Sequence, residues 1–177
     1  KAIIFYPGGL VSADAYLYML SGISTQTNQK IYVVKFPLSL AVTNINAADQ
    51  IVQANPEISN WTLSGHSLGG AMACRYVRDN SDKVNMLILM ASYCDQSISD
   101  KDTSVLLLYG SRNNGIDQNA LDEFEQNLPA DAKIVLIEGM NHAQFGNYGP
   151  QQGDNPADIS DDRATERVVD EVVGFFD

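Results

Sequence analysis

Short apolar runs recur along the chain at intervals that suit β-strands. They lie at 2–6, 31–34, 61–64, 86–90, 105–109 and 133–137, and most are bounded by Gly, Pro or polar residues. Short apolar runs between such breakers are typical of buried strands. The most continuous runs, at 86–90 and 105–109, favour a parallel sheet covered on both faces. The pattern therefore predicts a sheet of about six strands.

Segments with helical spacing fill the gaps between these runs. Apolar residues from Ala13 to Leu20 follow Ser12, a candidate N-cap, and Gly22 is expected to end that helix. Further helices are expected near 46–54, 70–79, 121–128 and 164–176. Because strands and helices alternate, the sequence predicts an α/β fold, with a mostly parallel sheet and helices on both faces. Residues 1–177 are expected to form one domain without a lid domain.

Charge and hydropathy narrow the possible partners. The formal net charge is −11, from 22 acidic and 11 basic residues. A surface this acidic repels nucleic-acid backbones and anionic membranes, so nucleic-acid binding is not expected. No apolar run approaches the ~18 residues of a membrane-spanning helix, so no span is expected in this chain.

Two cysteines, Cys74 and Cys94, bear on metal binding and on the redox compartment. Neither belongs to a C-x-x-C pair or to a Cys/His cluster with zinc spacing, so no metal site is expected. The simplest interpretation is a pair of small, buried apolar side chains. A disulfide stays open as an alternative, and the compartment stays open with it.

A candidate nucleophile lies in the segment GHSLG at 65–69, which matches the G-x-S-x-G pattern of a nucleophile elbow. The pattern requires a strand that runs directly into a helix, and both are predicted around it. Small residues beside the serine let the two elements pack closely, and the turn exposes the serine hydroxyl at the helix N-terminus. Ser67 is therefore the candidate nucleophile. The alternative is a serine N-cap on an ordinary glycine-rich turn.

A serine nucleophile needs a base, usually a histidine, and the chain has only two. His66 adjoins Ser67, so its side chain is directed elsewhere and a packing or hydrogen-bonding role fits it better. His142 follows the last strand, at the sheet edge where ligands collect in open α/β folds. The order of Ser67 before His142 also suits a hydrolase of this fold. His142 is the candidate base, and a plain surface-loop histidine is the alternative.

Backbone amides are the expected oxyanion donors. One is that of Leu68, directly after the nucleophile, and the other is that of Gly9 in the loop after the first strand, with Leu10 as its neighbour. The alternative is that this glycine-rich loop is only a tight turn. The long polar loop at 143–160 is also expected to border the site, with Phe145 and Tyr148 as candidate lining residues, and a solvated connector is the alternative.

Several segments together resemble the bacterial α/β-hydrolase fold-5 family, which is related to the dienelactone hydrolases. The resemblance covers nearly the whole chain and rests on FYPGG at 5–9, FPL at 36–38, LAV at 40–42, GHSLGG at 65–70 and NHAQFGNYGP at 141–150. It implies a Ser–Asp–His triad and a chain that starts at the third strand of the full fold. Similar proteins often carry an N-terminal membrane anchor, which implies an extracytoplasmic domain.

The triad acid departs from that family's pattern. The resemblance implies an aspartate shortly after the penultimate strand, often just before a glycine, and this chain has Asn113 and Asn114 there. Asp117 lies in the same loop and is the first candidate acid, although it also suits a helix cap. Asp95 is the second candidate. Deamidation of Asn114, which precedes a glycine, is a third route to a carboxylate.

These features predict a serine hydrolase of the carboxylesterase type that acts on small or accessible acyl esters through Ser67, His142 and Asp117. No cofactor is expected, the expected partner is a small-molecule acyl substrate, and the oligomeric state stays open. The main alternative is a degenerate hydrolase that binds a ligand or partner without turnover. A transferase or peptidase on the same fold also stays open, since fold does not fix chemistry.

Overall fold

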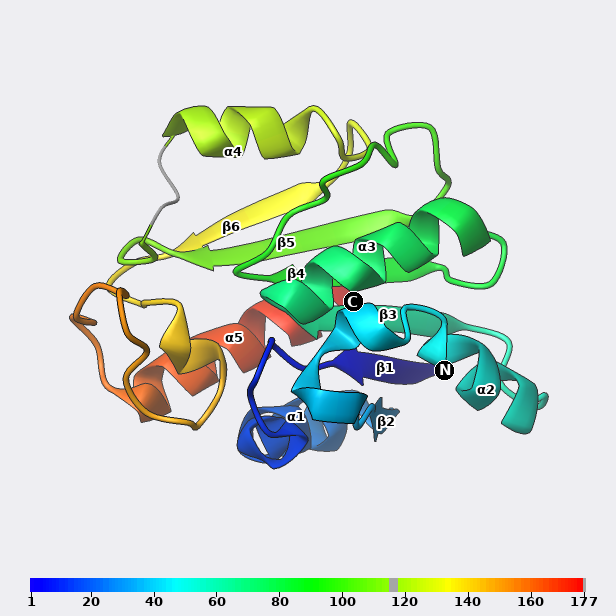
Figure 1. Cartoon of the computed structure of the whole chain (residues 1–177), viewed down its shortest axis with the longest axis horizontal. Coiled ribbons are helices and arrows are strands. Elements are labelled where there is room, and N and C mark those ends of the chain that lie inside the picture. Colours follow the sequence, from blue (N-terminus) through cyan, green and yellow to red (C-terminus); the bar gives the residue numbers. More distant parts are fainter. Residues whose placement is uncertain (115–117, 177) are drawn as a thin grey trace.

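Six parallel strands form the centre of the molecule. The computed structural model describes residues 1–114 and 118–176. In its described part the strands are β1 (Ala2–Tyr6), β2 (Lys30–Val33), β3 (Trp61–His66), β4 (Met86–Met90), β5 (Ser104–Gly110) and β6 (Lys133–Ile137). Their spatial order is β2-β1-β3-β4-β5-β6, and each neighbouring pair is parallel (Figure 1). The predicted sheet is confirmed.

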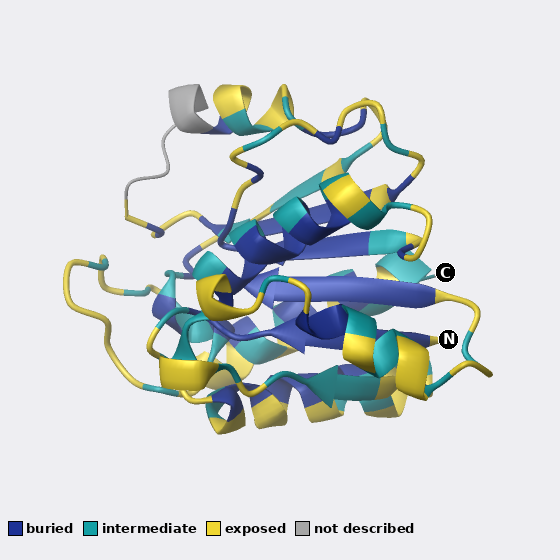
Figure 2. Ribbon diagram, turned by 45° about the vertical axis from the view of Figure 1, so that its right-hand side comes forward, coloured by how far each residue is buried: buried dark blue, intermediate teal, exposed yellow. Residues whose placement is uncertain are grey.

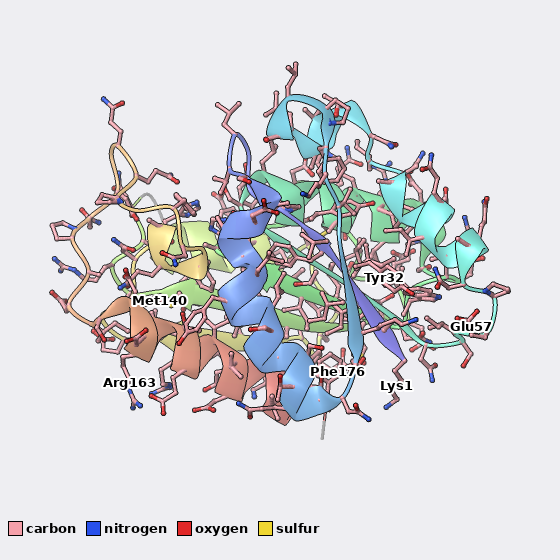
Figure 3. The ribbon with its side chains drawn as sticks, turned by 90° about the horizontal axis from the view of Figure 1, so that it is seen from below. Lys1, Tyr32, Glu57, Met140, Arg163 and Phe176 are labelled. Atoms are coloured by element: carbon pink, nitrogen blue, oxygen red, sulfur yellow. A yellow bond between two sulfur atoms is a disulfide. The ribbon has the colours of Figure 1, made fainter. Side chains whose placement is uncertain are left out.

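Helices cover both faces of this sheet. They are α1 (Leu17–Thr27), α2 (Ala47–Ala54), α3 (Leu68–Asn80), α4 (Gln118–Glu125) and α5 (Asp161–Phe176), with short 3₁₀ helices at Ala13–Tyr16, Pro37–Ser39, Ala41–Thr43 and Ala143–Phe145. Helices α1 and α5 lie side by side on one face (Figure 3). Helices α2 and α3 lie on the other face, and α4 lies near the edge that ends in β6 (Figure 1).

Two apolar cores, one on each side, explain why the strands are apolar at nearly every position. In β1, Ile3 and Phe5 belong to the core under α1 and α5, whereas Ile4 and Tyr6 belong to the core under α3. Side chains alternate across a strand, so a sheet that is covered on both faces needs apolar residues at both alternations. Figure 2 shows the result as a band of buried strands between half-exposed helices.

Helix α1 departs from its predicted length. It continues through Gly22 to Thr27 and ends at Asn28, whose φ of 53° is the left-handed conformation common after helices. A Cβ on Gly22 would lie 3.1 Å from Cγ2 of Val169 in α5. Gly22 therefore serves the close packing of α1 on α5 and does not stop the helix.

Candidate active site

The predicted functional residues gather at one edge of the sheet. Because all six strands are parallel, their carboxyl ends lie together, and the loops that follow them meet there. The long segment after β6, drawn in gold and orange in Figure 1, lies at this edge. The amide of Arg112, after β5, donates to the carbonyl of Met140, after β6, at 2.9 Å. This bond joins the loop of Asn113 to the loop of His142.

Ser67 lies at the junction of β3 and α3 in a conformation that suits a nucleophile elbow. Its φ of 51° and ψ of −123° are unusual for a residue with a side chain, and such conformations cost about 1–3 kcal/mol. Neighbouring groups hold it there: its amide donates to the carbonyl of Met90 at 3.0 Å, and its carbonyl accepts from Ser92 Oγ at 2.7 Å. The strand–turn–helix context expected of an elbow is present.

Glycines are required on both sides of this turn. A Cβ on Gly65 would lie 2.6 Å from the backbone carbon of Gly69, and a Cβ on Gly69 would overlap the carbonyl oxygens of Tyr6 and Pro7. Any side chain at either position would therefore separate α3 from β1 and β3. The close approach places Ser67 at the start of α3, where the helix N-terminus stabilises negative charge.

The two proposed oxyanion donors are neighbours. Gly9 lies against Leu68, since a Cβ on Gly9 would be 3.0 Å from Leu68 Cδ2. In the loop after β1, the amide of Gly8 donates to Tyr16 Oη at 3.0 Å and that of Leu10 to the carbonyl of Ser39 at 2.8 Å. Within the described part of the chain, the Gly9 amide has no such partner. The Gly9 amide is therefore free to bind a substrate oxygen.

Ser67 and His142 line the same cavity, whose volume is about 360 Å³. Its remaining lining residues are Leu68, Ala71, Ala91, Ser92, Tyr93, Asn113, Asn114 and Phe124. Burial lowers the pKa of His142 below its usual value of 6.5, and the charge of Asp154 opposes that shift. His142 is therefore neutral at pH 7, the state in which an imidazole accepts a proton.

The Alpha/beta hydrolase family profile matches residues 2–166. The chain belongs to the alpha/beta hydrolase family. The resemblance seen in the sequence is thus confirmed, and the enzyme class expected for the chain is that of a hydrolase. A search of curated proteins finds no match.

Solved structures share the fold of this hydrolase at low sequence identity. A monoacylglycerol lipase from Paleococcus ferrophilus has a TM-score of 0.72 and 13% identity, and the match covers 99% of this chain and 95% of that one. A carboxylesterase from Bacillus subtilis has a TM-score of 0.74 and 11% identity, over 99% and 83%. A predicted CIB-like hydrolase from Thermoplasma acidophilum has a TM-score of 0.73 and 14% identity, over 98% and 86%.

The candidates for the triad acid lie in different places relative to the cavity. Asp117 lies outside the described residues. Asp95 pairs with Arg75 of α3, both of its oxygens lying 3.1 Å from Arg75 Nε, and it does not line the cavity. Asn113 and Asn114 do line the cavity beside His142, and Oδ1 of Asn113 is buried and has no hydrogen-bond partner among the described residues. The hydrolase thus presents amides where its family resemblance implies an acid.

A carboxylate that sequence reasoning missed lies near His142. Asp154, in the long loop after β6, accepts a hydrogen bond from the amide of Ala143 at 3.0 Å. Asp154 also accepts from the amide of Asn114 at 3.3 Å. The only signal in the sequence is an acidic residue in the loop that leaves from His142, and nothing in its spacing singles it out.

His66 has the hydrogen-bonding role expected for it. It is buried, its ring centroid lies 4.6 Å from that of His142, and its Nδ1 lies 2.9 Å from Tyr16 Oη. Burial holds the pKa of His66 well below 6.5, and the positive charge of a protonated His142 would lower that pKa further. His66 is therefore neutral. Phe145 stacks on His66 with its side chain buried in the core, and neither Phe145 nor Tyr148 lines the cavity of Ser67 and His142.

Cys74 of α3 and Cys94, after β4, form a disulfide. The simpler interpretation, two buried reduced cysteines, is wrong, and the alternative left open in the sequence holds. The bond fastens the segment that carries Ser92 and Tyr93, which line the cavity, to α3. In the described part of the hydrolase, no group of three His, Cys, Asp or Glu could hold a metal ion, and no helix is long and apolar enough to cross a membrane.

Proposed function

We propose that this hydrolase is a serine esterase that acts on small or accessible acyl esters. The observation that carries the proposal is that Ser67, in its strained elbow at the start of α3, lines the same cavity as a neutral His142. The Ser67 hydroxyl attacks the ester carbonyl while His142 takes its proton. The amides of Leu68 and Gly9 bind the oxyanion, and His142 returns the proton to the leaving alcohol. Water then hydrolyses the acyl-enzyme by the same steps.

The cavity and its surroundings support a small substrate. The segment between β4 and β5 spans only residues 91–103, and no helix is described in it. It offers little material for a lid that would enclose a long acyl chain. The lipase and the carboxylesterase among the structural neighbours agree with ester chemistry.

A fluorophosphonate probe tests this proposal, with Ser67→Ala as the matched control. The wild-type chain is expected to be labelled and to hydrolyse p-nitrophenyl acetate and butyrate, with kcat/KM falling steeply beyond medium-chain esters. Ser67→Ala should do neither while unfolding at nearly the same temperature. Retained hydrolysis in Ser67→Ala, or a preference for long-chain lipid emulsions, would contradict the proposal.

A second candidate is a degenerate hydrolase that binds a ligand without turnover. The amides of Asn113 and Asn114 favour it, because neither side chain can supply the carboxylate that a triad uses. Absence of labelling in the folded wild-type chain would support this candidate. A gain of labelling in Asn114→Asp would then show that loss of the acid is the reason.

The disulfide supports a proposal about compartment. We propose that the chain works in an oxidising, extracytoplasmic environment, because disulfides persist there and are rare in reducing cytosol. The family resemblance implies the same place. Alkylation of the denatured protein from its native cells, with and without reductant, tests it. Thiols that react before reduction would contradict the proposal.

A further inference from the structure

A carboxylate approaches His142 from the loop that follows it. Oδ2 of Asp154 accepts the amide of Ala143, the residue directly after His142, at 3.0 Å. Its Oδ1 accepts the amides of Asn155 at 3.0 Å and of Asn114 at 3.3 Å. One side chain therefore joins the loop after β5, where a triad acid is expected, to the turn that carries the candidate base.

Asn114 keeps this loop in place. Its Nδ2 donates to the carbonyl of Gly153 at 2.5 Å, next to Asp154. Asn141, directly before His142, donates from its side chain to the carbonyl of Asn155 at 2.8 Å. The residues on both sides of Asp154 are thus fastened to the two loops that flank the cavity. An amide at position 114 cannot supply a charge, but here it holds the segment that carries one.

We propose that Asp154 is the positioning carboxylate of this site: it fixes the turn of His142 and stabilises the charged imidazole, in place of the acid missing at Asn113 and Asn114. The proposal rests on the proposed function, because it needs His142 to act as the base. Asp154 acts through His142 and does not contact the reacting atoms.

The electrostatics around His142 agree with this role. Two titratable groups face His142 in the described part of the chain: His66, with ring centroids 4.6 Å apart, and Asp154. Burial lowers the pKa of His142, and Asp154 opposes this effect. The Tyr148 phenol also senses Asp154, since burial first and this carboxylate second raise its pKa above the usual value. The negative charge of Asp154 therefore reaches into the site.

The proton of the Ser67 hydroxyl passes to His142 and then to the leaving alcohol, so the reaction needs no further proton carrier. The Ser67 hydroxyl proton moves to His142 as the bond from Oγ to the acyl carbon forms, which leaves an imidazolium and a tetrahedral oxyanion. Asp154 stays ionised and accepts no proton; its charge favours the imidazolium. As the intermediate collapses, the imidazolium gives the proton to the leaving alkoxide.

The test compares Asp154→Asn with Asp158→Asn. Asp158 is a carboxylate of the same loop that pairs with Arg112 at 3.3 Å, so its variant makes the same change of charge without facing His142. Asp154→Asn should lower kcat on p-nitrophenyl acetate by about 10- to 100-fold with little change in KM. This is less than the ~10⁴-fold for a carboxylate bonded directly to the base. Asp158→Asn should match the wild-type chain.

The titration of His142, followed by NMR, separates positioning from a merely structural role. Asp154→Asn should lower the pKa of His142, and the acid limb of kcat/KM should move to lower pH with it. Asp154→Glu should restore part of both. An unchanged His142 titration in Asp154→Asn, or an equal loss of kcat in Asp158→Asn, would overturn the proposal. So would a silent Asp154→Asn beside an Asp117→Asn variant that loses activity.

Failure of the proposed function has a different signature. If the site is inactive, the wild-type chain will not be labelled by the fluorophosphonate and will not hydrolyse esters. The titration of His142 does not depend on activity. A lowered pKa of His142 in Asp154→Asn would therefore support the pairing even in an inactive protein, whereas an unchanged pKa would overturn it.

Discussion

The phenol of Tyr16 joins His66 to the proposed oxyanion loop. Its oxygen accepts the amide of Gly8 at 3.0 Å and lies 2.9 Å from His66 Nδ1. The direction of the bond between Tyr16 Oη and Nδ1 is set by the tautomer of the His66 ring, and in either direction the phenol pairs with that ring nitrogen. The Tyr16 hydroxyl thus links His66, at the end of strand β3, to the loop that carries Gly9.

Tyr16→Phe should therefore affect both stability and catalysis. The variant leaves a buried amide and a buried ring nitrogen unpaired, which should cost about 2–4 kcal/mol in unfolding free energy. It should also lower kcat by about tenfold, less than the 10²–10³-fold for removing an oxyanion donor, because Gly9 is displaced but kept. Urea unfolding and ester kinetics measure the two effects. Tyr18→Phe, whose side chain is exposed, is the control. Equal kinetics in the two variants would contradict a role for Tyr16 in the oxyanion loop.

Stability should depend on pH through His66. Its pKa in the folded chain lies well below the ordinary 6.5. Below pH 6.5 the unfolded chain takes up a proton that folded His66 does not, so its contribution is complete above pH 6.5 and is lost as pH falls toward the folded pKa. The free energy of unfolding should therefore fall as the pH is lowered from about 6.5 toward the folded-state pKa of His66. His66→Asn should flatten this dependence in urea titrations. The same slope in wild type and variant would assign the effect to other groups.

The strands and the elbow could be predicted because their signals are local. A buried parallel strand has to be apolar at every position, and the elbow has to carry glycines at fixed offsets from its serine. The runs at 86–90 and 105–109 fall within β4 and β5, and Ser67 follows β3 directly. That Ser67 precedes His142 could also be predicted, because it depends only on the order of the strands along the chain.

The remaining features depend on contacts between distant segments. Gly22 stays helical because α5 brings Val169 close to it. Cys74 meets Cys94 only because α3 packs beside the end of β4. Asp154 lies in a loop without periodicity, and only its hydrogen bonds to Asn114 and Ala143 reveal its place. No spacing in the sequence encodes these three contacts.

The disulfide should contribute substantially to stability. Cys74 and Cys94 are 20 residues apart in sequence. Closing a loop of this size restricts the unfolded chain enough to stabilise the fold by about 3 kcal/mol in the chain-entropy model. The double variant Cys74→Ala, Cys94→Ala should show that loss in urea unfolding, and reduction of the wild-type chain should approach it. The double variant itself should not respond to reductant. A wild-type chain equally stable with and without reductant would contradict a structural role for the bond.

The strain at Ser67 makes a prediction that separates function from stability. At φ 51° and ψ −123°, a residue with a Cβ is held in a conformation that glycine adopts freely. Ser67→Gly and Ser67→Ala should both be inactive, but Ser67→Gly should be the more stable by about 1 kcal/mol, because relief of strain exceeds the added entropy of the unfolded chain. Ala71→Gly, within helix α3, measures that entropy where no strain is relieved and should be destabilised by about 1 kcal/mol. Urea unfolding of the three variants decides the matter. If Ser67→Gly is no more stable than Ser67→Ala, the elbow stores no strain and the exposure of its hydroxyl costs the fold nothing.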